Sequence, residues 1–182
     1  MIVYHGSTHR FKKLRIGKSL VECRSTVDNE GYGIYFSTDR TVAESYGPYI
    51  YVLEINDECL KDFREKEVCR RYLNDLCNYV FEKTGILLKE YVNLSHTLDR
   101  MRLGGLAVSG VGREIYLLLD SEELFYRQVC ETKREKLYRL LRNYDRKHLD
   151  AYMFEYHIKN IGVIKNVSAD VVKIIRREAS NS

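Results

Sequence analysis

GYGIYFSTDRTVAESYG, residues 31–47, is the stretch on which the expected fold depends. Two glycines lead into an aromatic and β-branched run at residues 33–37, and a short segment of helical character then reaches Tyr46. β-Branched and aromatic residues favour strands, and glycine permits a backbone approach that a side chain would block. The stretch therefore predicts a strand and a short helix whose Tyr35 and Tyr46 rings form the two faces of a slot for a flat heterocycle, with the glycines permitting close backbone approach.

Further strands are expected at both ends of the chain. Residues 2–6 (IVYHG) and 49–55 (YIYVLEI) are rich in β-branched and aromatic residues, and the second run alternates with a period of two. Residues 152–166 and 170–178 have the same character and predict two or three more strands. Strands grouped around a helical middle favour an α+β fold over the regular alternation of a parallel α/β sheet.

The middle of the chain changes to a helical period. Apolar residues recur at helical spacing across residues 57–83, with Asp57 in position to cap the first turn and Gly85 in position to end the last. We expect one or two helices there. Other expected elements are helices at 89–103, 121–129 and 132–145, a strand at 113–119, and a loop with a short helix at 17–23.

Composition favours one globular domain over residues 1–182, because 45% hydrophobic and 31% charged residues are ordinary values for such a chain. No apolar run approaches the roughly 18 residues of a membrane span. The N-terminal residues lack a basic segment followed by an apolar one, so we expect no secretory leader and a cytoplasmic location. The cysteines, at positions 23, 59, 69, 77 and 130, have no C-x-x-C spacing, and we expect no disulfide framework and no metal.

Residues 133–148, KREKLYRLLRNYDRKH, are rich in Lys and Arg and are suited to an anionic partner such as nucleic acid. The apolar residues of this segment fall at i, i+3, i+4 and i+7, which is typical of an amphipathic helix. The simpler interpretation, which we favour, is a helix whose solvated face is basic.

His5 and the two tyrosines have side chains suited to one chemistry. An imidazole can hydrogen-bond a ribose hydroxyl, a following glycine exposes backbone groups to a flat ligand, and tyrosine rings can sandwich an aromatic ring. His5, Gly6, Tyr35 and Tyr46 together would hold a nicotinamide riboside. Each of them taken alone is more typical of a structural residue.

These residues resemble a known signature. The motifs are His5-Gly6-Ser7, Gly31-x-Gly33-Ile34-Tyr35-Phe36 and Ala43-x-x-Tyr46. In this order they resemble the NAD-binding signature of the diphtheria-toxin-like and poly(ADP-ribose) polymerase branch of the ADP-ribosyltransferases, and also blocks shared by small bacterial proteins of unknown function. The resemblance covers mainly residues 2–55. It implies split antiparallel β-sheets with a helical insertion, with NAD as substrate and no metal.

The resemblance also implies a role for each motif residue. In that branch the histidine binds the nicotinamide-side ribose, the next glycine pairs with the carboxamide, and the two tyrosines stack on the nicotinamide ring. These roles fall on His5, Gly6, Tyr35 and Tyr46. The flanking motif residues Ser7 and Gly33 are assigned to the same NAD site. Ala43 stands where the polymerases place a serine that bonds the carboxamide, a loss of about 1 kcal/mol of net hydrogen bonding.

The third functional residue of the family is usually a glutamate near a late strand. A carboxylate there favours the positive charge that builds on the ribose as the bond to nicotinamide breaks. Glu155 matches best by type and place, and Asn160 is the alternative, because residues 161–175 could equally be aligned as the motif strand. Glu114 and Gln128 are weaker candidates. A neutral Asn160 would indicate a transferase of unusual chemistry or an inactive binding protein.

The expected function is therefore a cytoplasmic, NAD-dependent mono-ADP-ribosyltransferase, a toxin or effector with His5, Tyr35 and Glu155 as catalytic residues. The expected acceptor is a macromolecule, a protein in preference to a nucleic acid, with no membrane involved. Two alternatives remain: a non-catalytic binding or inhibitor protein on the same scaffold, and an NAD glycohydrolase in which water is the acceptor.

Overall fold

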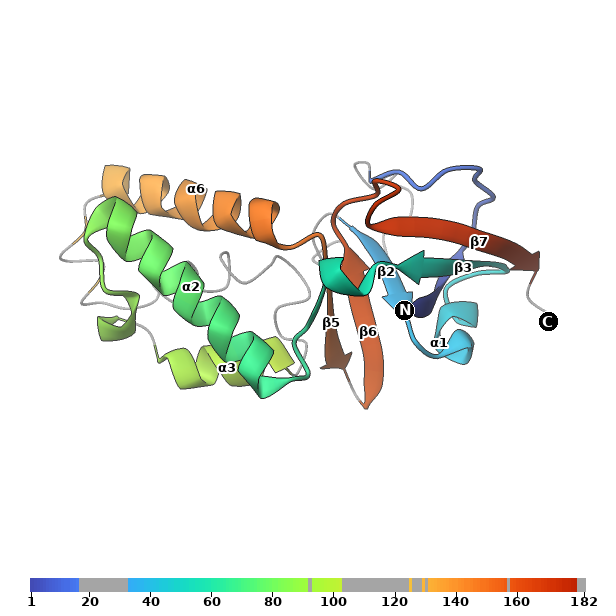
Figure 1. Cartoon of the computed structure of the whole chain (residues 1–182), viewed down its shortest axis with the longest axis horizontal. Helices are drawn as coiled ribbons and strands as arrows, with labels where there is room; N and C mark the ends of the chain where they lie inside the picture. Colours follow the sequence, from blue (N-terminus) through green and yellow to red (C-terminus); the bar gives the residue numbers. More distant parts are fainter. Residues whose placement is uncertain are drawn as a thin grey trace. The chain divides into compact units, whose positions relative to one another are not determined.

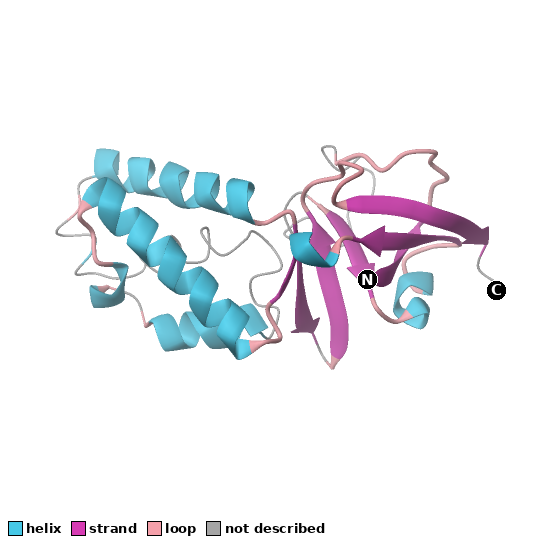
Figure 2. Cartoon of the chain, viewed as in Figure 1, coloured by secondary structure: helices cyan, strands magenta, loops and turns pink. Residues whose placement is uncertain are grey.

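The computed structural model describes residues 1–16, 33–91, 93–102, 125, 129, 131–156 and 158–179. Within these ranges the fold is α+β, as expected, with a seven-stranded, mostly antiparallel sheet and four α-helices (Figure 2). The chain divides into two compact units: a sheet unit, Met1–Asp62 with Leu149–Ser182, and a helical unit, Phe63–His148. The helical unit is inserted in the sequence between two strands. Such an insertion is compatible with one domain, so the single-domain interpretation stays a prediction.

The sheet has the strand order β4-β5-β6-β2-β1-β3-β7. Its strands are β1 (Ile2–Ser7), β2 (Ile34–Ser37), β3 (Tyr49–Ile55), β4 (Leu60–Asp62), β5 (Ala151–Tyr156), β6 (Lys159–Ile164) and β7 (Val172–Ala179). Only β4 and β5 are parallel; all other neighbours are antiparallel. Figure 1 shows β7 beside β3 and β6 beside β5, so the C-terminal strands lie on both sides of the N-terminal ones.

The strands expected at the two ends of the chain are confirmed. Residues 2–6, 33–37 and 49–55 correspond to β1, β2 and β3, and the C-terminal stretches give β5, β6 and β7. Strand β4 was not expected, because its three residues lie inside the range assigned to a helix. They form a strand by pairing with β5, whose residues follow the helical unit, and a contact between such distant residues leaves no local signal.

The two faces of the sheet have different neighbours. Antiparallel partners point to the same face and successive residues to opposite faces. One face, here called the core face, carries Val3, Phe36 and Leu53 and forms the main apolar cluster with Met153 and Ile164. The opposite face, here called the helix face, carries the alternate residues of β1 and β2 and is covered there by α1.

Helix α1 (Arg40–Glu44) follows β2 directly. Asp39 precedes it as N-cap, with its Oδ1 accepting a hydrogen bond from the Thr41 N–H at 2.8 Å. Val42 and Ala43 are its buried residues. The short helix expected within residues 31–47 is therefore confirmed.

The strands β1 and β2 pair along only a small part of their length. β1 pairs with β3 at six register positions but with β2 only at Tyr4 and Ser37. β2 in turn pairs with β6 at four positions. The sheet thus consists of two well-paired halves, β4-β5-β6-β2 and β1-β3-β7, joined at what we call the β1–β2 junction.

In the helical unit, α6 (Glu131–His148) runs alongside α2 (Lys66–Thr84), as Figure 1 shows. The fully buried Leu76 and Leu141 belong to the core of this unit. α2 ends at Gly85, which adopts the left-handed conformation with φ 73°, as the sequence predicted.

The remaining helix predictions are confirmed in part. α3 (Leu94–Arg102) and α6 match the expected helices at 89–103 and 132–145. The helix expected from residue 57 begins at Lys66 instead, after a short 3₁₀ turn, Asp57–Cys59, that Asn56 caps. The predictions for 17–23 and 113–119 lie outside the described residues, as does 121–129 except for Phe125 and Val129. No helix in the described ranges is both long and apolar enough to cross a membrane.

Candidate functional site

His5 bridges the β1–β2 junction through its side chain. Its Nδ1 lies 2.7 Å from the carbonyl oxygen of Tyr35. A carbonyl only accepts hydrogen bonds, so Nδ1 carries the proton and donates. In the neutral ring this leaves Nε2 with a lone pair, and Nε2 can accept a hydrogen bond from a hydroxyl group.

Aromatic rings surround this imidazole. The ring centroids of Phe11 and Tyr51 lie 5.9 Å and 6.0 Å from that of His5. Burial lowers the pKa of His5 below its ordinary value of 6.5, although the hydrogen bond to Tyr35 opposes this shift. The imidazole is therefore neutral at physiological pH, which is the form that offers Nε2 as an acceptor.

Gly6 is the point where α1 meets the sheet. A Cβ built on Gly6 would lie 1.8 Å from the carbonyl oxygen of Ala43 and 3.2 Å from the Cβ of Tyr46. No side chain fits in that space, so the glycine lets the last turn of α1 pack directly on β1. This is a structural reason for Gly6 that the sequence did not reveal, beside the expected role of its backbone.

Tyr35 and Tyr46 lie on the helix face, whereas His5 projects from the core face. Tyr35 stands between Ile34 and Phe36 of the core cluster, so the pleat turns its half-buried ring the other way. Tyr46 is 53% exposed and packs its Cβ against Gly6. The two rings therefore lie on one face of the sheet and the imidazole on the other, so the structure does not bring the three side chains together around one gap.

The other two motif residues have local structural roles. The Ser7 hydroxyl donates to the His9 carbonyl at 2.9 Å and accepts from the His9 N–H at 3.1 Å, which closes a tight turn. A Cβ on Gly33 would lie 2.2 Å from Cγ1 of Val163, so this glycine allows the start of β2 to lie against the end of β6. Neither contact tests the expected part of Ser7 and Gly33 in NAD binding.

An ion-pair network holds α1 against β7. Arg40 pairs with Glu44 through Nε at 2.9 Å and with Glu178 through Nη1, and Arg176 also bonds Glu178. Burial alone would raise the pKa of Glu178, but the hydrogen bonds from Arg40 and Arg176 hold it below its ordinary value. The sequence gave no sign of this support for α1, because Arg40 and Glu178 are 138 residues apart.

Glu155 and Asn160 lie directly opposite each other on the β5–β6 hairpin, on the core face. The Asn160 carbonyl accepts hydrogen bonds from Ser37 Oγ at 2.9 Å and from the Thr38 N–H at 3.3 Å. Asn160 therefore belongs to the strand next to β2, and the exposed Glu155 is one strand farther away. The weaker candidates, Glu114 and Gln128, lie outside the described residues.

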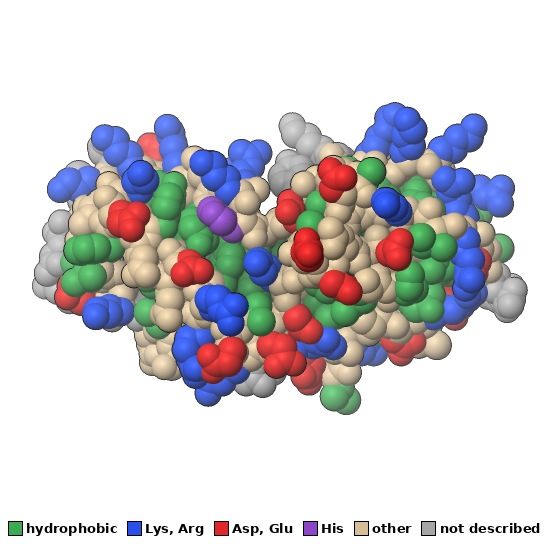
Figure 3. Space-filling view, viewed as in Figure 1, with side chains coloured by type: hydrophobic (Ala, Val, Ile, Leu, Met, Phe, Trp, Pro, Cys, Tyr) green, Lys and Arg blue, Asp and Glu red, His purple; other side chains and the backbone are tan. Residues whose placement is uncertain are grey.

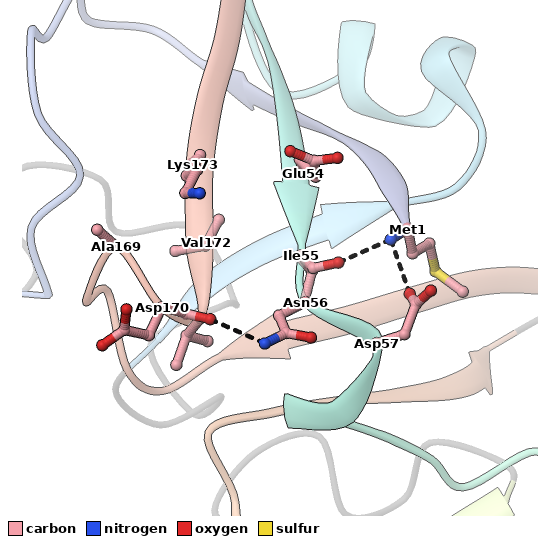
Figure 4. Close-up of a pocket in the computed structure, with 10 residues that line it drawn as sticks. Met1, Glu54, Ile55, Asn56, Asp57, Ala169, Asp170, Val172 and Lys173 are labelled. Carbon is pink, nitrogen blue, oxygen red and sulfur yellow. Dashed lines mark hydrogen bonds and ion pairs between the residues drawn. The ribbon is translucent and has the colours of Figure 1, made fainter.

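The sheet unit also has a cavity of 460 Å³ at the ends of β3 and β7, away from the motif residues (Figure 4). Its lining includes Asn56, whose Nδ2 donates to the Asp170 carbonyl at 3.1 Å, and Asp57, whose Oδ1 accepts from the Met1 amino group at 2.7 Å. In Figure 4 these polar groups bond one another around the cavity. None of the predicted NAD-binding residues lines it.

Within the described residues, no group of three or more His, Cys, Asp or Glu side chains is arranged to hold a metal ion. A comparison with protein-family models finds no match, and neither do searches of curated proteins and of solved structures. A functional assignment therefore depends on the motif residues and on the geometry of the β1–β2 junction.

Proposed function

We propose that this chain is an NAD-dependent mono-ADP-ribosyltransferase whose site is the β1–β2 junction. The observation that supports this most is the hydrogen bond from His5 Nδ1 to the Tyr35 carbonyl. It links the two motifs at the point where the pairing of the sheet narrows to one register position. Tyr46 lies against Gly6 at the same point.

In this proposal the nicotinamide ring binds on the helix face. Tyr46 and Tyr35 stack on the ring once α1 moves away from β1, and the backbone of Gly6, which α1 covers in this structure, then pairs with the carboxamide. A ribose hydroxyl donates to Nε2 of the neutral His5 on the core face, which requires the β1–β2 junction to open when NAD binds.

The reaction breaks the bond between ribose C1′ and the nicotinamide nitrogen. Nicotinamide leaves with the bonding electron pair, and positive charge develops on the ribose. A nucleophilic oxygen or nitrogen of the acceptor forms the new bond to C1′ and releases its proton to solvent. His5 and Tyr35 orient the ribose and the ring so that this bond lies open to the acceptor.

The third residue comes from the β5–β6 hairpin in this proposal. Glu155 supplies a carboxylate that favours the developing positive charge. Asn160, on the strand next to β2, can instead orient a hydroxyl without adding charge. Glu155→Gln and Asn160→Ala separate the two: the variant that lowers kcat at least tenfold while NAD still binds identifies the residue.

The central test is incubation with NAD labelled on the adenylate and a cell lysate. We expect labelled macromolecules and released nicotinamide from the wild type, and neither from His5→Ala. Tyr46→Ala should abolish the NAD-induced rise in melting temperature, whereas Phe81→Ala, which truncates a side chain 48% exposed on the helical unit, should not. Binding of NAD without nicotinamide release would exclude transfer.

The neutral Asn160 beside β2 favours one alternative, a non-catalytic NAD-binding protein on the same scaffold. For that protein NAD raises the melting temperature of the chain, but no nicotinamide is released. Nicotinamide release without any labelled macromolecule would identify a glycohydrolase instead.

A further inference from the structure

Five cations form a surface beside the core face, which we call the basic loop surface. Four lie on the loop that follows β1, Arg10, Lys12, Lys13 and Arg15, and the fifth is Arg177 of β7. All five are exposed. Figure 3 shows Lys and Arg side chains gathered over this loop and β7, at the upper right. Residues 8–16 include no acidic residue.

The backbone of this loop is held in place. Phe11 stacks on Tyr51 with ring centroids 3.8 Å apart, and its N–H donates to the hydroxyl of the fully buried Tyr51 at 2.7 Å. Arg177 Nη2 donates to the Lys12 carbonyl at 2.7 Å. The exposed cations therefore extend from an ordered backbone rather than from a loose loop.

These cations lack acidic partners in the part of the chain that the structure describes: none of the four on the loop forms an ion pair there. Arg40 and Arg139, by contrast, each bond a glutamate. Unpaired like charges held close together produce a positive potential that attracts a polyanion.

The side chains of the basic loop surface suit a phosphate backbone better than a protein partner. Protein interfaces usually have an apolar centre. Here the apolar side chains of the loop, Phe11, Leu14 and Ile16, pack inward against the core cluster. The exposed side chains of the basic loop surface are cations, and cations supply most of the contacts to a phosphate backbone.

We propose that the basic loop surface binds the sugar–phosphate backbone of a nucleic acid and presents it as the acceptor of ADP-ribose. The loop lies next to His5, whose ring centroid is 5.9 Å from that of Phe11. A base nitrogen or phosphate oxygen would form the bond to ribose C1′ as nicotinamide leaves. The acceptor role rests on the proposed function, whereas the binding does not. This proposal replaces the protein acceptor that the sequence alone favoured.

The binding test is fluorescence anisotropy with a labelled 20-base-pair DNA duplex, over a range of salt concentrations and without NAD. The test variant replaces Lys12, Lys13 and Arg15 by alanine. The control variant replaces Lys133, Lys136 and Arg142, exposed cations of α6, and removes the same charge. If each lost cation removes one phosphate contact, the slope of log K against log salt should become shallower by about two to three for the test variant.

The wild type and the control variant should keep similar slopes, and the test variant should bind at least about tenfold more weakly at low salt. Equal loss in the control variant, no salt-dependent binding, or equal competition by polyglutamate would overturn the binding proposal. The last result would indicate an acidic protein partner.

Labelled NAD is then added to the bound duplex and to a matching single strand. Label should enter the nucleic acid with the wild type, and less with the triple loop variant. Unlabelled nucleic acid together with labelled protein would overturn the acceptor role. Absence of any label and of nicotinamide release would overturn the proposed function itself and leave the binding result unaffected.

Discussion

His5 joins two strands by its side chain at a place where backbone pairing has ended. Its Nδ1–H bonds the Tyr35 carbonyl at 2.7 Å, while its ring lies among Phe11 and Tyr51. The same environment that fixes the ring also lowers the pKa of His5. One residue therefore stabilises the junction and keeps an acceptor nitrogen available.

The lowered pKa of His5 predicts that the free energy of unfolding depends on pH. Because the pKa of His5 is lower in the folded state than its ordinary 6.5, the unfolded chain binds more protons as pH falls below 6.5. The stability that neutral His5 provides is complete above pH 6.5 and is lost as pH falls toward the folded pKa. Urea unfolding from pH 7.5 to about 5 should show a smaller pH dependence for His5→Gln than for the wild type. The control, Phe81→Ala, removes no titratable group and should keep the pH dependence of the wild type. An unchanged pH dependence of the unfolding free energy in His5→Gln would contradict the assignment.

The close packing of α1 on Gly6 predicts that a larger residue at this position destabilises the fold. Gly6→Ala would place its Cβ 1.8 Å from the Ala43 carbonyl oxygen, so α1 must move away from β1. We expect a loss of about 1–3 kcal/mol in the free energy of unfolding, the range for overpacking. Denaturant titration measures it, with the exposed Thr8→Ala as control. A change under about 0.5 kcal/mol, typical of a surface site, would show that α1 does not lie on Gly6.

At the scale of elements, α1 is too short to form alone, because isolated helices need about 12–15 residues. Its five residues are stabilised by the Asp39 cap at one end and by the Arg40–Glu178 pair on its side. The position of Tyr46, directly after this helix, depends on both contacts. The β5–β6 hairpin similarly positions Asn160 through the hydrogen bonds that its carbonyl accepts from β2 and Thr38.

The cap of α1 can be tested separately. Asp39→Ala removes the acceptor of the Thr41 N–H, and amide hydrogen exchange in α1 should become faster. Asp39→Asn keeps an acceptor oxygen and should retain most of the protection. Equal exchange rates in the two variants would show that the side chain does not cap the helix. Hydrogen bonds from Thr41 lower the pKa of Asp39, so protection should decrease only in strongly acid solution.

For the whole molecule, the chain divides into a sheet unit and a helical unit. The helical unit contains a buried polar link, the Tyr72 hydroxyl donating to Asp145 Oδ1 at 2.7 Å. Next to it, burial together with the nearby carboxylates raises the pKa of Tyr144 to about 12. Tyr144 therefore stays neutral over the physiological range.

The division into two units predicts that a mutation in the helical unit weakens that unit first. Tyr72→Phe removes a buried donor to a carboxylate and should cost about 1–3 kcal/mol of stability. Amide exchange should become faster in α2 and α6 but not in β1 and β3, because protection is lost first in the unit that contains the change. Faster exchange throughout the chain would show that the two units unfold together.

Local sequence patterns predicted most of the elements but not their pairing. The period-two run at residues 49–55 and the helical period around α2 and α6 depend on residues close in the chain, and both predictions are confirmed. The opposite orientations of His5 and Gly6 were also accessible, since neighbouring residues of a strand must face opposite ways. Strand β4 and the Arg40–Glu178 pair were not accessible, because each joins residues separated by a long stretch of chain.

The sequence by itself determined the α+β class, the positions of β1 to β3 to within about one residue, and the motif residues from His5 to Tyr46. These features follow from local periodicity and residue chemistry, which short-range forces decide. Only the tertiary structure decided that β1 and β2 pair at one position, that α1 lies on Gly6, and that Arg177 meets the Lys12 carbonyl. Such contacts depend on how distant strands align in one sheet, and that alignment is set by the packing of the whole core rather than by any segment alone.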